Sequence, residues 1–260
     1  MTNKTILITK PEEHLLQITL NRPEVRNAIN VDMMQELLLF WESMMTDTET
    51  RCIILTGTPP AFCAGADLKV RKDLDIKTWM KQHEMTQQAM RAMVKCPIPV
   101  IAAVNGHAFG GGLELTLAAD FAYASDNAKF AQSETKLGIM PGAMGTQNLP
   151  RAVGARRAKE LTFTAEPFTA QQAFEWGIIN KICSGAELLN SSLETAKKIA
   201  GNAPIANRQA KKSINVAGDL DIQQGYTFEI DTYNELLNTE DRVEGINAFN
   251  EKRKPDFKGK

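Results

Sequence analysis

The sequence predicts an α/β core followed by a helical C-terminal region. Short apolar segments of strand length alternate with stretches of helical periodicity in the first part of the chain, whereas helical patterns dominate after about residue 154. A chain of 260 residues, of which 43% are hydrophobic, is long enough to build one large domain around a substantial core.

The first predicted strand and helix lie near the N-terminus. Leu16, Ile18 and Leu20 alternate with polar residues, which is the pattern of a half-buried strand. Pro23 cannot continue a paired ladder and ends this strand, and Asn30 can cap a following helix. The apolar residues of that helix recur at helical spacing, at positions 34, 37, 38, 41 and 45.

Three further apolar segments predict strands, at residues 52–57, 100–104 and 121–124. A helix is predicted between the first two, at residues 76–94. The segment around Glu114 is ambiguous. Its leucines alternate at strand spacing, while the three preceding glycines and two following alanines favour a helix.

Composition and charge argue against several classes of protein. A formal net charge of −1 with 23% charged residues is unlike a protein whose main partner is a polyanion or an acidic membrane. The sequence shows no secretory signal pattern and no run of the ~20 apolar residues that a membrane helix needs. The cysteines form no C-x-x-C pair and the histidines have no zinc-site spacing, so we expect reduced thiols, a cytoplasmic location and no metal.

A glycine cluster at residues 110–112 follows the strand predicted at 100–104. Glycine lets a ligand approach bare backbone, and a helix starting there would favour negative charge. The cluster lacks the lysine and hydroxyl residue of a Walker loop, and no G-x-G-x-x-G pattern occurs here. Taken alone, this cluster and the small-residue loop at 61–69 predict tight turns more often than ligand sites.

Glu114 and Glu134 are the carboxylates of interest. Glu114 lies between two leucines, and Glu134 precedes an apolar segment that leads to Pro141 and Gly142. A carboxylate in apolar company is exposed on a polar face, paired, or raised in pKa for catalysis. Spacing alone favours exposure for each glutamate. No G-x-S-x-G or H-E-x-x-H motif offers another catalytic scheme.

Four ordered motifs together resemble the crotonase, or enoyl-CoA hydratase/isomerase, superfamily. Residues 62–69 (FCAGADLK) and 105–115 (NGHAFGGGLEL) resemble its two oxyanion segments. Residues 133–147, which begin with Ser-Glu-Thr and contain Pro-Gly and Gly-Thr-Gln, resemble its third motif. Residues 249–254 (FNEKRK) resemble its C-terminal segment. The resemblance covers nearly the whole chain and is more specific for the superfamily than for the reaction.

The resemblance implies a crotonase-like spiral core of repeated ββα turns over residues 1–195. A helical oligomerisation region would follow over residues 196–260, in trimers or dimers of trimers. The resemblance also makes the ambiguous segment around Glu114 a helix.

The resemblance further implies a site for a coenzyme A thioester, in which coenzyme A is part of the substrate and no separate cofactor is needed. The N–H groups of Ala66 and Gly111 would form an oxyanion hole, in which one donor is worth ~3 kcal/mol. Glu114 would be the base that activates water, and Glu134 the acid that protonates the α-carbon. The remaining implied contacts with coenzyme A, the water or a neighbouring subunit's ligand are Arg26, Ala64, Asp67, Leu68, Lys69, Gly142, Phe249 and Lys252.

The expected reaction is hydration of the 2,3 double bond of an enoyl-CoA. Both glutamates are present, which favours a hydratase over an isomerase or a decarboxylase on the same loops. Residues 134–137, 158–163 and 241–245 resemble the 3-methylglutaconyl-CoA hydratase branch. A dicarboxylic acyl group would want a cationic partner, which the sequence does not place. Met144 and Asn148 stand where the third motif commonly has glycine and arginine, which leaves the acyl specificity open.

Binding without catalysis is the alternative of another class. The chain could bind acyl-CoA without turnover, or bind RNA through a basic helix around residues 68–95. The basic residues of that region are Lys69, Arg71, Lys72, Lys77, Lys81, Arg91 and Lys95. Asp73, Asp75 and Glu84 dilute them, so we expect a solvated amphipathic face and no nucleic acid partner.

Overall fold

Six strands form the main sheet of the computed structural model, which describes residues 4–260. They are β1 (Ile6–Glu12), β2 (Leu15–Leu20), β3 (Cys52–Gly57), β4 (Val100–Val104), β6 (Phe121–Ser125) and β9 (Lys181–Cys183). β1 and β2 pair antiparallel, and every later neighbour in the order β1-β2-β3-β4-β6-β9 pairs in parallel. A smaller sheet in the order β5-β7-β8 contains β5 (Ala108–Phe109), β7 (Lys129–Ala131) and β8 (Phe168–Thr169).

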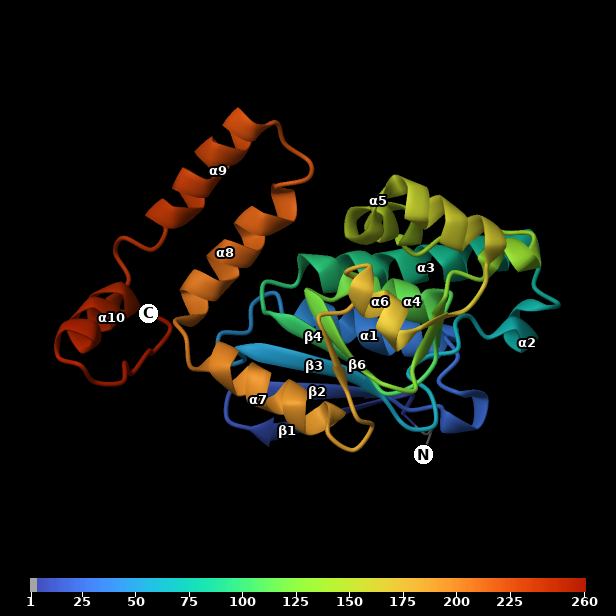
Figure 1. The fold of residues 1–260 in the computed structure, drawn as a ribbon, viewed down its shortest axis with the longest axis horizontal. Helices are drawn as coiled ribbons and strands as arrows, with labels where there is room; N and C mark the ends of the chain where they lie inside the picture. The colour runs from blue at the N-terminus through green and yellow to red at the C-terminus, as the bar shows by residue number, and fades with distance from the viewer. Residues whose placement is uncertain (1–3) are drawn as a thin grey trace.

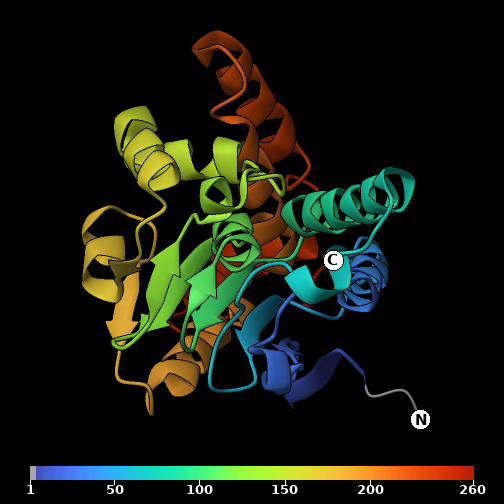
Figure 2. The same ribbon diagram turned by 90° about the vertical axis from the view of Figure 1, so that its right-hand side faces the viewer.

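Helices surround the two sheets and continue beyond them (Figures 1 and 2). Those of the core are α1 (Val31–Ser43), α2 (Leu68–Arg71), α3 (Ile76–Lys95), α4 (Gly111–Ala118), α5 (Gly145–Thr164), α6 (Ala170–Glu175) and α7 (Leu188–Ala200). The C-terminal helices are α8 (Pro204–Val216), α9 (Ile222–Asn234) and α10 (Glu240–Asn250). Two short 3-10 helices, η1 (Pro23–Val25) and η2 (Glu134–Leu137), interrupt the loops.

Both faces of the main sheet are buried. On β3, Ile53 and Leu55 belong to the large apolar cluster that also contains residues of α1 and α3. Cys52 and Ile54 point the other way, into a second cluster with residues of α7. A parallel strand covered on both faces is apolar along its whole length, which is why residues 52–57 form a continuous apolar run. All four cysteines are buried and unbridged.

Most of the predicted elements are confirmed. The Asn30 side chain accepts a hydrogen bond from Met33 N at 3.0 Å and caps α1. The segment around Glu114 is helical, as α4. Helices dominate after residue 154, as predicted, but the sequence did not reveal two short strands there, β8, which pairs with β7, and β9, which pairs with β6. These strands have two and three residues, too few for alternation to be visible in the sequence.

The C-terminal helices lie to one side of the core (Figure 1). The boundary predicted between residues 195 and 196 falls within α7, which still packs its buried Leu188 and Ala196 against the sheet. The chain leaves the sheet after this helix, and α9 packs against α8. Within residues 4–260, no helix combines the length and the apolar character that crossing a membrane requires.

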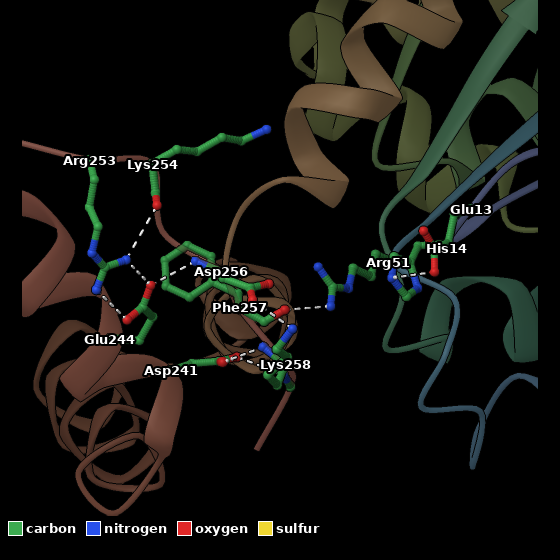
Figure 3. A network of polar contacts seen from close by, with 11 residues as sticks. Glu13, His14, Arg51, Asp241, Glu244, Arg253, Lys254, Asp256, Phe257 and Lys258 are labelled. Carbon is green, nitrogen blue, oxygen red and sulfur yellow. Dashed lines mark hydrogen bonds and ion pairs between the residues drawn. The ribbon is translucent and has the colours of Figure 1, made fainter.

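A network of polar contacts fastens the end of the chain (Figure 3). The Arg51 guanidinium donates to the backbone oxygens of Ala200, at 3.0 Å, and Phe257, at 2.7 Å. The Asp241 carboxylate accepts hydrogen bonds from the backbone N–H groups of Lys258, at 2.6 Å, and Gly259, at 2.9 Å. The C-terminal tail is therefore attached both to the core and to α10 by charged side chains that meet backbone groups.

Candidate active site

A cavity of about 1110 Å³ opens beside α3, where the loops before α2 and α4 meet the segment from Ser133 to Gln147. Seven residues predicted for the site line it: Ala64, Ala66, Leu68, Gly111, Glu114, Glu134 and Gly142. Loops that are far apart in the sequence thus contribute their predicted residues to one space.

The other five predicted contacts do not line this cavity. Asp67 is buried and forms an ion pair with Arg22, with 3.0 Å between Nη2 and Oδ2. The Arg26 backbone oxygen accepts a hydrogen bond from Ala64 N, and the Lys69 side chain is exposed. Phe249 and Lys252 lie in and just beyond α10, at the opposite end of the view from α2, and Phe249 is 83% exposed (Figure 1).

Backbone hydrogen bonds hold the two glycine-containing loops side by side. Cys63 N donates to His107 O, and Phe109 N donates to Cys63 O, each at 3.0 Å. Gly65 has a φ of +92°, and a β-carbon there would lie 2.8 Å from Phe109 O, so only glycine allows this approach.

The loops leave two backbone donors unused. Ile29 pairs with the residues on either side of Ala66, because Ile29 N donates to Gly65 O and Asp67 N donates to Ile29 O. Gly111 is the first residue of α4, where N–H groups have no partner within the helix. Among residues 4–260, neither the Ala66 N–H nor the Gly111 N–H donates a hydrogen bond to protein. The cavity wall therefore contains two backbone donors available to a ligand oxygen.

Glu114 projects from α4 and is 3% exposed. Its Oε1 accepts hydrogen bonds from Ala143 N at 2.8 Å and Gly145 N at 2.9 Å. No described residue donates to its Oε2. Burial and, second, the charge of Glu134 raise the pKa of Glu114 to about 7, against the opposing effect of the two N–H donors. Two hydrogen bonds thus fix Oε1 in place, while Oε2 can accept or release a proton near neutral pH.

Glu134 begins η2 and is 8% exposed. The Gln132 Nε2 donates to both carboxylate oxygens of Glu134, each at 3.0 Å. Burial raises the pKa of Glu134, and the hydrogen bond from Gln132 partly opposes this rise. The expectation from spacing alone, that both glutamates are exposed, is therefore wrong, because the helix and loops that surround them come from distant parts of the chain.

Sequence reasoning missed Gln132, which holds Glu134 in place. Its Oε1 is buried and has no hydrogen-bond partner among the described residues. Its spacing gave no usable signal, because Ser133, between the two residues, has a φ of −97° and a ψ of 1°, which is not extended chain.

Arg71 and His83 are also part of the cavity wall. The Arg71 guanidinium lies over the Trp79 ring, 5.8 Å from its centroid. The His83 ring stacks on the Trp79 ring, with 5.2 Å between the two centroids. Burial and the nearby Arg71 charge lower the pKa of His83. From the sequence we expected Arg71 to be one of the basic residues of a solvated helix face. In the structure it lines the cavity.

Comparisons with known proteins agree over nearly the whole chain. The family model described as enoyl-CoA hydratase/isomerase matches residues 10–260. A short-chain-enoyl-CoA hydratase from Clostridium acetobutylicum is 39% identical over 95% of this chain and 95% of its own. A 2,3-dehydroadipyl-CoA hydratase from Escherichia coli is 38% identical over 98% of this chain and 99% of its own. The crystal structure of an enoyl-CoA hydratase from Bacillus anthracis superposes with a TM-score of 0.96 at 40% identity, over 98% of this chain and 100% of that one.

Proposed function

Because the chain belongs to the enoyl-CoA hydratase/isomerase family, we propose that it adds water across the 2,3 double bond of an enoyl-CoA thioester. The observation that carries this proposal is that Glu114 and Glu134, both buried, share one cavity with the unused N–H groups of Ala66 and Gly111. Such a set supplies a base, an acid and an oxyanion site, which are the groups that conjugate addition of water requires.

The oxyanion site acts on the thioester. When a nucleophile adds to the β-carbon, the π electrons move through the α-carbon and place negative charge on the thioester oxygen. The Ala66 and Gly111 N–H groups would donate to this oxygen, and each such donor is worth ~3 kcal/mol in the transition state. Because backbone donors are fixed in place before the reaction, they need not reorganise as the charge develops.

The two carboxyl groups move protons on either side of this step. Glu114 Oε2 takes a proton from water while the water oxygen bonds to the β-carbon. Glu134 then donates a proton to the α-carbon as the enolate collapses. The cycle closes when the proton gained by Glu114 returns to Glu134. Two nearby carboxyl groups titrate as a pair, so one proton shared between them serves both roles near neutral pH.

Membership of the family does not specify which acyl group the substrate carries. The name of the Escherichia coli relative specifies an acyl chain derived from a dicarboxylic acid, whereas that of the Clostridium acetobutylicum relative specifies a short chain. Both kinds of enoyl-CoA therefore remain candidate substrates for this chain.

Self-association is a further part of the proposal. Four apolar residues recur at helical spacing along α9 and are each more than half exposed: Ile222, Tyr226, Ile230 and Tyr233. A continuous exposed apolar stripe on one helix favours a protein interface. This stripe supports a homo-oligomer, such as a trimer or a dimer of trimers.

The test of the reaction is the loss of ultraviolet absorbance of crotonyl-CoA, with wild type beside Glu114→Gln and Glu134→Gln. We expect hydration by wild type and a ~100- to 10,000-fold lower kcat in each variant, because each removes one proton-transfer group. Glu84→Gln, on the exposed side of α3, is the matched control and should keep wild-type activity. Circular dichroism and butyryl-CoA binding check that each variant is folded.

Two other outcomes would redirect the assignment. Conversion of but-3-enoyl-CoA into crotonyl-CoA without any hydration would make the protein an isomerase. Binding of butyryl-CoA with no turnover of crotonyl-CoA, glutaconyl-CoA or longer enoyl-CoAs would make it a non-catalytic acyl-CoA-binding protein.

A further inference from the structure

We propose that Arg71 binds a free carboxylate at the far end of the substrate's acyl chain, so that the preferred substrates are enoyl-CoA thioesters carrying a second carboxyl group. This inference rests on the proposed function for the site it concerns and adds the class of acyl group. It assigns to Arg71 a part in substrate selection rather than in proton transfer.

Arg71 is a cation without an anionic partner. Its side chain is half-buried at the end of α2, and it forms no ion pair and no hydrogen bond with the residues from 4 to 260. The other cations of the wall differ from it. Lys136 pairs with Glu166 at 2.8 Å, and Arg91 is exposed and donates to Gln87 Oε1 at 3.4 Å. Arg71 is thus the wall cation whose charge is least compensated by protein or solvent.

The guanidinium lies near the reacting carboxylates without contacting them. Its charge lowers the pKa of Glu114, yet no oxygen of Glu114 or Glu134 comes within 4.0 Å of its nitrogens. The Trp79 ring lies on one side of it, 5.8 Å from ring centroid to the guanidinium carbon. Arg71 and the two glutamates therefore border the same cavity from separate elements, and we place the acyl chain between them.

Apolar side chains also line the cavity that Arg71 borders. They include Leu68, Met90, Ile139 and Met140. In such surroundings an unpaired cation is costly, because water is displaced when the ligand binds. A hydrocarbon acyl chain would leave this cost in place, whereas a carboxylate would remove it through two parallel charge-assisted hydrogen bonds. Selection against the neutral chain follows, because that chain leaves the half-buried guanidinium of Arg71 unpaired.

Two other roles for Arg71 make different predictions. If Arg71 served only to tune Glu114, its removal would slow every substrate equally. If it bound the phosphates of coenzyme A, its removal would likewise weaken every thioester by the same factor. A carboxylate partner alone makes the effect depend on the acyl group.

The kinetic experiment compares kcat/KM for glutaconyl-CoA, which has a terminal carboxylate, and crotonyl-CoA, which has none. Wild type should prefer glutaconyl-CoA. In Arg71→Met the ratio of the two kcat/KM values should fall ~10- to 100-fold, in line with the loss of one charge-assisted pair. Arg71→Lys should retain part of the preference. Arg91→Met, the same change at the exposed arginine of the wall, should keep the wild-type ratio. An unchanged ratio in Arg71→Met, or no preference in wild type, would overturn the proposal.

A binding experiment separates this inference from the proposed reaction. Glutaryl-CoA and butyryl-CoA are saturated, so calorimetry measures their affinities without turnover. Tighter binding of glutaryl-CoA that depends on Arg71 would support the carboxylate site even if no enoyl-CoA were hydrated. Equal affinities, together with rapid hydration of crotonyl-CoA, would refute the carboxylate site and leave the hydratase assignment intact.

Discussion

The sheet-based core and the C-terminal helices are stabilised in different ways. In the core, β3 and β4 are buried along their whole length, and most of α4 is buried as well. In α8, α9 and α10 together, the buried residues are few: Pro204, Thr232, Asp241 and Ala248.

Charged side chains that meet backbone oxygens connect the two regions. Arg208 donates to the oxygens of Asp47 and Thr50, and Lys211 donates to Ile98 O and pairs with Asp120. Arg51 reaches in the opposite direction, to Ala200 O and Phe257 O (Figure 3). The core has its own hydrophobic stabilisation, whereas the C-terminal helices have a polar attachment and an apolar surface that a second chain could cover.

The largest expected effect is on the core. Trp41 is 1% exposed and packs edge-on against Phe40, with 5.0 Å between ring centroids. Trp41→Ala should lower the free energy of unfolding by about 3–5 kcal/mol, because it leaves a cavity in a packed interior. Urea titration at micromolar protein measures this loss. A loss below about 1 kcal/mol would mean that the core is not the main source of stability.

The next largest effect is the loss of folding free energy that the buried Glu114 carboxylate causes when it is charged. With a folded pKa of about 7 and an ordinary value of 4.5, Glu114 binds more protons in the folded than in the unfolded state between these pH values. Wild-type stability should therefore fall as pH rises from about 4.5 to 7, by about 3 kcal/mol at most from this group. Glu114→Gln should lack the part of this fall that comes from Glu114 and be more stable than wild type at pH 7.

Denaturant unfolding at pH 5 and pH 7.5 tests this prediction. Glu229→Gln, on the exposed surface of α9, is the control and should show the wild-type pH dependence. A Glu114→Gln variant that loses activity and is also less stable than wild type at both pH values would contradict the idea that the buried charge is costly.

The smallest expected change in protomer stability is in the C-terminal helices. Ile230 is 59% exposed in the apolar stripe of α9, so Ile230→Asp should alter protomer stability by no more than about 0.5 kcal/mol. The same change should disrupt self-association, because it places a charge in the centre of the proposed interface. Sedimentation velocity measures the oligomer. Thr227→Asp lies on another side of α9 and should leave the assembly unchanged.

Some elements could be predicted from the sequence alone. The predicted bounds of β3 and α3 agree closely with the structure, because a strand covered on both faces and a long amphipathic helix have strong local patterns. The sequence also identified the cap at Asn30, since capping depends on residues within one turn. The ordered motifs identified the family, and seven of the twelve site residues that they suggested lie on the cavity wall.

Only the tertiary structure decided the environment of those residues. Glu114 and Glu134 look like surface carboxylates from their spacing, and their burial comes from loops distant in the sequence. Arg71 looks like one basic residue among several, yet it lies over the Trp79 ring of α3 and lines the cavity. The physical reason is that local propensity depends on near neighbours in the chain, whereas burial, charge pairing and pKa depend on which distant segments pack together.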